Sequence, residues 1–81
     1  MSKQHHYLKT LTNFYQDVEC GVKKFEVRFN DRNFKVGDII YLEEFVPPST
    51  YTGRKLRREV TYILDNPEYC KQGYVILGLK H

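Results

Sequence analysis

The chain of 81 residues alternates apolar and polar side chains over short stretches, which is the pattern of a small β protein. Successive side chains of a strand point to opposite faces, so each alternating stretch predicts a strand with two unlike faces. The strands expected from this pattern are 7–10, 24–30, 39–45, 55–64 and 74–79, with a short extended piece at 34–38. The stretch 39–45 starts apolar on both faces, which indicates a buried strand.

One segment has helical spacing instead. Between Leu11 and Val18 the apolar side chains recur at positions i, i+3, i+4 and i+7, which predicts an amphipathic helix over 12–20. Thr12 is the expected N-cap, because its hydroxyl can accept a hydrogen bond from an unpaired backbone N–H. Gly21 is expected to take the left-handed conformation that ends many helices.

Turn-forming segments separate these elements. Residues 46–50 are expected to form a loop, because Pro47 and Pro48 remove backbone donors from any ladder. Residues 51–54, Tyr-Thr-Gly-Arg, are expected to form a turn that closes a hairpin, or one whose backbone N–H groups face an anion. Short strands joined by turns predict a mainly β (α+β) fold, a closed or nearly closed barrel of five or six strands with one helix.

Charged residues gather where the helix gives way to the strand at 24–30. Alternation puts the apolar side chains of 25, 27 and 29 on one face and the charged ones of 24, 26 and 28 on the other. Together with Lys23, the pair Glu26 and Arg28 can hold a polar or anionic ligand, since Lys and Arg bind phosphate oxygens. The cluster can equally be a solvated ion ladder of little energetic weight, with Arg28 paired to Asp31 or Asp38.

A second group of cations follows Tyr51 and consists of Arg54, Lys55, Arg57 and Arg58. Cations beside an exposed aromatic ring can follow a phosphate backbone while the ring stacks on a base. The alternative is a solvated hairpin in which these arginines pair with Glu43, Glu44 and Glu59. Alternation separates Arg57 from Arg58, so only part of the group can share a face.

Composition narrows the class of protein. A chain of this length forms one domain, residues 1–81, with a modest core. Seven Tyr and five Phe supply large rings, and a net charge of +3 is compatible with a polyanionic partner without requiring one. The chain has no apolar run long enough for a membrane span and no signal-peptide pattern at its start, so we expect a cytoplasmic protein. Oligomeric state does not follow from the sequence, which is compatible with a monomer.

Metal and cofactor chemistry has little support in the sequence. His5, His6, Cys20 and Cys70 match no zinc-binding spacing, so we expect no metal and no cofactor. Two cysteines do not make a disulfide framework, and a reducing compartment would keep them as thiols. His6 can point toward a cleft as a hydrogen-bond partner or proton carrier, or serve as a structural histidine.

The order of several short blocks resembles a known family. The blocks are His6-x-Leu8-Lys9, Gly21-x-Lys23-x-x-Glu26-x-Arg28, Asn30-Asp31-Arg32-x-Phe34-x-Val36-Gly37-Asp38, Tyr51-Thr52-Gly53-Arg54 and Gly73-Tyr74-Val75-x-Leu77-Gly78-Leu79. From about residue 4 to residue 80 the chain resembles the ASCH domains of the PUA-like superfamily, in a small subfamily associated with phages and plasmids whose function is unknown. The resemblance implies a pseudo-barrel with a helix beside its mouth.

The same resemblance implies a site. In ASCH domains the polar residues of the Gly-Lys-Glu-Arg motif are proposed to line a cleft between barrel and helix, which here means Lys23, Glu26 and Arg28. Some ASCH relatives hydrolyse an acylated nucleoside with a lysine, a threonine and a separate glutamate, and ribonuclease activity has been proposed for others. Glu26 stands where those hydrolases carry the threonine, and a carboxylate does not replace a hydroxyl nucleophile. A Lys–Glu pair can still perform acid–base chemistry.

Three functions remain open from the sequence. We expect first an RNA- or nucleotide-binding module whose cleft of Lys23, Glu26 and Arg28 is extended by Arg32, Tyr51, Arg54 and Arg57. The second is a small hydrolase acting on a modified nucleoside or on RNA, with Lys23 and Glu26 as its catalytic pair. The third is a protein-interaction module of a phage or plasmid, which the strands apolar on both faces disfavour because they predict a closed core without a large exposed patch.

Overall fold

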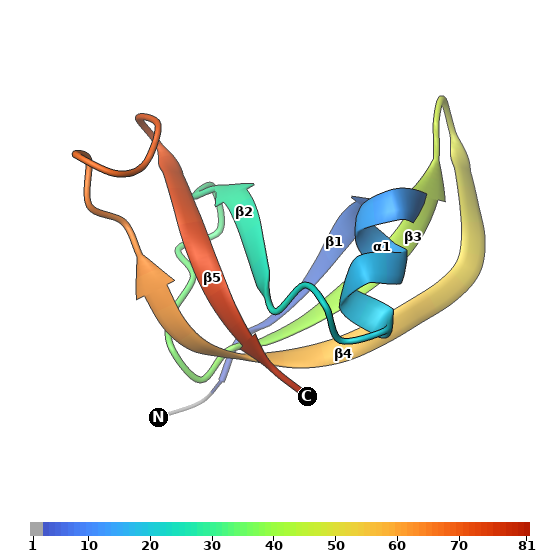
Figure 1. Ribbon diagram of the computed structural model, residues 1–81, viewed down its shortest axis with the longest axis horizontal. Helices are drawn as coiled ribbons and strands as arrows, with labels where there is room; N and C mark the ends of the chain where they lie inside the picture. The colour runs from blue at the N-terminus through green and yellow to red at the C-terminus, as the bar shows by residue number, and fades with distance from the viewer. Residues whose placement is uncertain (1–2) are drawn as a thin grey trace.

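A computed structural model describes residues 3–81, and these form five strands and one helix around a single strongly curled sheet (Figure 1). The elements are β1 (His5–Leu11), α1 (Thr12–Glu19), β2 (Phe25–Phe29), β3 (Ile39–Val46), β4 (Thr50–Leu64) and β5 (Tyr74–Lys80). The sheet order is β1-β3-β4-β5-β2, with β1 parallel to β3 and all other neighbours antiparallel. This mainly β half-barrel with one short helix confirms the predicted fold class.

The long strand β4 runs through both halves of the half-barrel. Its first part pairs with β3 and its last part with β5, so the sheet folds into two wings that share β4 (Figure 1). We call β1, β3 and the start of β4 the first wing, and β2, β5 and the end of β4 the second wing. Helix α1 packs on the first wing, on the side that faces the second.

The core lies between the helix and the inner faces of both wings. The buried side chains that form it come from every strand except β2, together with α1 and the 30–38 segment: Leu8, Tyr15, Val18, Phe34, Ile40, Leu42, Val60, Val75 and Leu77. Strand β3 is buried on both faces where it begins, as its sequence predicts, since Ile39 and Ile40 are both fully buried. No helix in residues 3–81 is both long enough and apolar enough to cross a bilayer.

One end of α1 agrees with the prediction and the other does not. At the C-terminal end, Gly21 has φ +86°, its N–H bonds the carbonyl of Val18, and the N–H of Val22 bonds that of Asp17. This pair of bonds closes the helix as predicted. At the N-terminal end the prediction for Thr12 is wrong, because Leu11 occupies the N-cap and no side chain caps it. The Thr12 side chain contributes instead to lowering the pKa of Glu44.

The hairpin between β3 and β4 also differs from expectation. The turn is confined to 47–49, and the segment 51–54, expected to be the hairpin turn, belongs to β4. The pairing of β3 with β4 slips between Glu43 and Phe45, where Gly53 takes φ +92°. Gly53 therefore supplies the positive φ expected of it, but at an irregularity within a strand.

The outer face of the second wing is apolar and open to solvent. Register places Phe29 beside Tyr74 and Val27 beside Ile76, with Leu64 of β4 beyond that pair and Tyr62 beyond Gly78. A register shift between Val60 and Tyr62 breaks the alternation of β4, so Tyr62 turns outward although it shares the parity of buried Val60. The expectation that no large apolar patch is exposed is therefore wrong. We call this surface the outer apolar face: Phe25, Val27, Phe29, Tyr62, Leu64, Tyr69, Tyr74 and Ile76.

Side chains bridge the two free edges of the half-barrel. Strands β1 and β2 stand at opposite ends of the sheet order, yet two arginines from the β2 side reach the outer carbonyls of β1. An Nη of Arg28 lies 2.9 Å from the carbonyl oxygen of Lys9, and one of Arg32 lies 2.8 Å from that of Tyr7. These bonds satisfy exposed edge carbonyls and draw the wings together at the place where backbone pairing stops.

Candidate functional site

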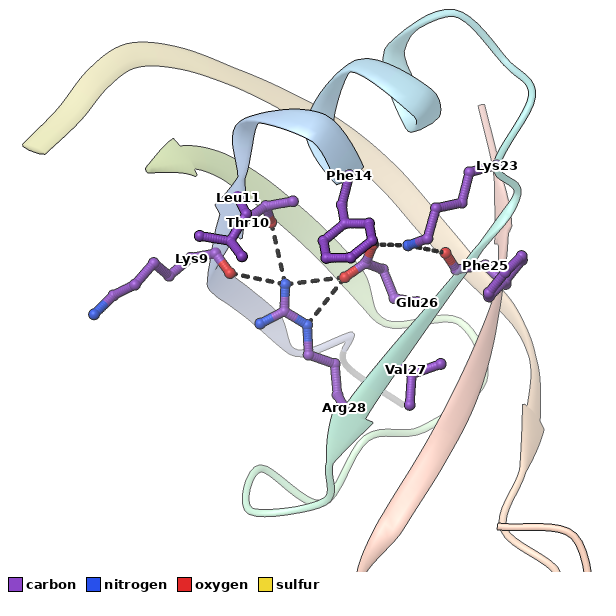
Figure 2. Close-up of a pocket in the computed structure, with 9 residues that line it drawn as sticks. All are labelled: Lys9, Thr10, Leu11, Phe14, Lys23, Phe25, Glu26, Val27 and Arg28. Atoms are coloured by element: carbon purple, nitrogen blue, oxygen red, sulfur yellow. Dashed lines mark hydrogen bonds and ion pairs between the residues drawn. The ribbon is translucent and has the colours of Figure 1, made fainter. Parts of the chain in front are cut away.

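A cleft of about 390 Å³ opens between the start of α1 and the facing edges of β1 and β2 (Figure 2). Its lining combines charged side chains with apolar ones: Lys9, Thr10, Leu11, Phe14, Lys23, Phe25, Glu26, Val27 and Arg28. The structure thus brings Lys23, Glu26 and Arg28 together at one cavity beside the helix. Two separate segments of the chain, 9–14 and 23–28, must meet to form it.

An ion network occupies the floor of the cleft. The Nζ of Lys23 lies 2.6 Å from Oε1 of Glu26 and donates a second bond, of 2.9 Å, to the carbonyl of Phe25. The Nε of Arg28 lies 3.0 Å from the other carboxylate oxygen, and its Nη reaches the hydroxyl of Thr10 at 3.1 Å. Figure 2 shows these contacts converging on Glu26 from both sides.

The network is largely buried, so it is not a solvated ion ladder. Glu26 is only 3% exposed, because the charged face of β2 points inward and its apolar face points to solvent. Removal of one partner from a buried ion pair costs about 3–5 kcal/mol, so the contacts with Lys23 and Arg28 stabilise Glu26 in this position. Pairing of Arg28 with Asp31 or Asp38 is wrong, since Arg28 is committed to Glu26.

Apolar walls rise above this charged floor. Phe14 of α1 is about half exposed, and the Nζ of Lys23 lies 5.5 Å from its ring centre and 5.0 Å from that of Phe25. Leu11 and Val27 complete the walls. A flat, partly polar molecule fits such a cleft, because its faces can contact the walls while its edge exchanges hydrogen bonds with the floor.

The other residues predicted to bind ligand lie outside the cleft. Arg32 donates a hydrogen bond to the carbonyl of Tyr7 on β1. Tyr51 and Arg54 line a separate hollow of about 190 Å³ with Glu43 and Lys55. Arg57 is exposed and forms no ion pair among residues 3–81.

Arg54 belongs to a structural cluster under the helix. Its Nε lies 2.8 Å from Glu44, a carboxylate that is only 4% exposed, and its guanidinium lies 5.0 Å from the ring of buried Tyr15. Hydrogen bonds from Arg54 and from the hydroxyl of Thr52 lower the pKa of Glu44 to about 2. The structure therefore confirms for Arg54 the alternative in which this arginine pairs with an acid, Glu44.

Two further residues of the sequence analysis also have structural partners. Arg58 is buried and donates to the carbonyl of Val18, which ties β4 to the end of α1. His6 is buried against Phe34, and its Nε2 lies 2.9 Å from Asp38. Burial alone would raise the pKa of Asp38, but the bond from His6 and two backbone N–H groups outweigh it and lower that pKa. His6 faces this aspartate and does not line the cleft.

Sequence reasoning missed six of the nine lining residues: Lys9, Thr10, Leu11, Phe14, Phe25 and Val27. Thr10 carried no signal, because a threonine inside a strand of mixed polarity is ordinary. Phe14 was assigned to the helix face that packs on the core, yet it lies on the flank that borders the cleft. Lys9 stood in a block of the family resemblance, which was the one available indication.

Comparison with known sequences defines the class of protein to which this curled sheet and cleft belong. The chain belongs to the family described as Domain of unknown function (DUF3850), whose model matches residues 5–79. The chain is also similar to a phage protein, the "Uncharacterized 12.9 kDa protein in GpA 3'region" of Escherichia phage P2. The two are 32% identical over 77 residues, which cover 95% of this chain and 69% of the phage protein. This is a small domain with a phage relative.

Proposed function

We propose that the domain binds RNA or a nucleotide-like ligand in the cleft between α1, β1 and β2. One observation carries the proposal, namely that the charged face of β2 points into a cavity whose walls include exposed rings. Nucleobases are flat and carry hydrogen-bonding edges, and unpaired bases are commonly held by stacking and edge contacts together. The resemblance to ASCH and PUA-like domains supports the same reading, because it assigns Lys23, Glu26 and Arg28 to a cleft.

The ligand we propose is a single nucleotide unit, free or at an unpaired position of an RNA strand. Of the cations at the cleft, Lys23 and Arg28 share the one carboxylate of Glu26, which leaves about one positive charge for a phosphate. Lys9 adds no charge there, because its side chain extends away from the ion network and its Nζ lies 4.5 Å from the ring centre of Phe45 (Figure 2). Arg32, Tyr51, Arg54 and Arg57 extend the site only for a longer strand that leaves the cleft.

An NMR titration of isotopically labelled protein tests the proposal. Nucleosides, nucleotides and a short single-stranded RNA are added in turn, and we expect shifts at Lys23, Glu26 and Arg28. Phe14→Ala should weaken binding at least tenfold with the fold intact, because this ring is half exposed and serves no core contact. The matched control, compared with nucleosides and single nucleotides as ligands, is Tyr51→Ala, which removes an exposed ring that only a longer strand would reach.

The comparison of variants decides the outcome. Equal losses in Phe14→Ala and Tyr51→Ala would place the ligand elsewhere, and no shift with any ligand would refute the proposal. Arg28→Ala is the weaker test, since Arg28 also bridges β2 to β1 and its loss disturbs the structure. Arg28→Lys keeps a cation at that position and separates charge from bridging.

A second candidate function is hydrolysis of a modified nucleoside or of RNA. The observation that favours it is the 2.6 Å contact of Lys23 with Glu26 inside the cleft, since such a pair can move a proton. Incubation with acylated cytidine and with short RNA would reveal products. Activity that is lost in Glu26→Gln would support this function, and activity that survives would assign it to a contaminant or another residue.

A further inference from the structure

We infer that the outer apolar face is an interface through which two copies of this chain form a symmetric dimer. On the three strands of the second wing, the outward side chains from 25 to 29, 62 to 64 and 74 to 76 carry no charge. Phe29 is 54% exposed, Tyr62 is 64% exposed and Tyr69 of the neighbouring loop is 73% exposed. This surface lies on the opposite side of the wing from the buried network of Glu26.

The exposed area is large for a domain of this size. Four rings, those of Phe25, Phe29, Tyr62 and Tyr69, are about half exposed or more, which leaves roughly 400–500 Å² of aromatic surface in water. The largest apolar patch on a typical monomer is about 300–600 Å² and is often functional. With Val27, the partly exposed side chains of β5 and a polar rim, the face approaches the roughly 800 Å² per partner of a standard interface.

The shape and charge of the face suit a second copy. A hollow of about 350 Å³ lies beside the projecting rings and is lined by Val27, Tyr69, Cys70, Lys71, Tyr74 and Ile76. A two-fold axis places the rings of each copy against the hollow of the other, so one surface supplies both halves of the contact. The 65–73 loop at its rim carries both signs of charge, Asp65 and Glu68 against Lys71, which lets opposite charges meet across the axis.

The same features argue against a nucleic acid on this face. Single strands are held by rings together with cations that follow the backbone. The strand side chains of the outer apolar face include no cation, and Lys71 at the rim already lies 5.7 Å from the ring centre of Tyr74. A neutral face is also where two copies of a chain with a net charge of +3 can meet with least repulsion.

Sedimentation velocity on the full chain tests the inference. We expect the dimer fraction to rise between about 1 µM and 1 mM protein, as befits an interface at the small end of the standard size. Tyr62→Lys and Tyr69→Lys place a charge on the face and should each raise the dimer dissociation constant at least tenfold. The control is Tyr51→Lys, which alters a half-exposed tyrosine of β4 on the first wing. This substitution should leave the dimer dissociation constant within twofold of the wild-type value.

Three outcomes would overturn the inference. One is a wild-type protein that stays monomeric to 1 mM, and another is equal weakening by all three substitutions. The third is a monomer in which short RNA shifts the amide signals of Phe29, Tyr62 and Tyr74, which would assign the face to nucleic acid. Circular dichroism of each variant verifies that the sheet is retained.

Discussion

The role of an individual side chain in this protein depends more on its partners than on its residue type. Glu26 and Glu44 are both carboxylates in strands, and both are almost fully buried. Glu26 is shared by two cations at the floor of the cleft, whereas Glu44 is held by Arg54 and two hydroxyls beneath the helix. The first faces a cavity large enough for a ligand and the second serves packing, so burial of charge alone does not identify the site.

Lowering the pH should reveal how much Glu44 contributes to the free energy of unfolding. Its pKa is about 2 in the folded protein against an ordinary value of 4.5, so the stability it supplies is complete above pH 4.5 and is lost as the pH falls toward 2. Urea unfolding at pH 7, 4.5, 3 and 2 should show a steeper loss of unfolding free energy in the wild type than in Glu44→Gln. Glu68→Gln, at an exposed loop position, is the control and should follow the wild type.

Local chemistry fixes some features of the secondary-structure elements, and contacts with neighbouring elements fix others. The C-terminal end of α1 follows from Gly21 alone, whereas its N-terminal end has no side-chain cap because Leu11, which has no polar side-chain atom, occupies the N-cap position. The orientation of strand β2 is also unexpected from its local sequence, since its apolar side faces solvent and its charged side faces inward. A period of two identifies the faces of a strand, but the neighbours decide which face is buried.

Replacement of Gly21 should affect both the helix and the cleft. Gly21→Ala forces a side chain into φ +86° and should lower the unfolding free energy by about 1–2 kcal/mol, although nothing blocks the new Cβ. Because the N–H of Lys23 bonds the carbonyl of Asp17 in this helix end, ligand binding should weaken as well. Gly21→Asn is the matched variant and should cost less, since Asn tolerates this conformation. Equal costs in urea unfolding would contradict this account.

The whole molecule has two faces of different chemistry on one thin wing. The inner side of β2 contributes Glu26 and Arg28 to the cleft and the outer side contributes Phe29 to the outer apolar face, while Phe25 and Val27 border both surfaces. A small half-barrel cannot cover both sides of every strand with core, so one side of this wing stays in water. Ligand binding and self-association can therefore occupy the same strand from opposite sides.

Salt should weaken RNA binding only modestly. Few cations at the cleft are free of acidic partners, so the number of phosphates neutralised should be about one or two and the logarithmic slope about −0.7 to −1.4. Affinity for a six-nucleotide single strand, measured by fluorescence anisotropy, should fall roughly three- to sevenfold between 50 and 200 mM salt. A fall of about a hundredfold would mean that Arg32, Arg54 and Arg57 also contact phosphates, although Arg32 and Arg54 have partners in the structure.

The sequence by itself determined the local features of this protein. Periodicity identified the strands and the helix, glycine chemistry located the end of α1, and the motif with Lys23, Glu26 and Arg28 named three residues that meet at one cleft. The elements and the helix end follow from short-range rules, because backbone conformation and the alternation of faces depend on residues close in the chain. The cleft role of the three motif residues is what the resemblance to ASCH domains implied.

Only the tertiary structure decided how these parts face one another. It turned the charged side of β2 inward, committed Arg54 to Glu44, brought Thr10 and Phe14 to the cleft and left Tyr62 outside. The physical reason is that burial and ion pairing are set by what lies across the sheet, from residues ten or more positions away along the chain. A register shift of one residue, as in β4 after Val60, is enough to reverse which side chains reach water.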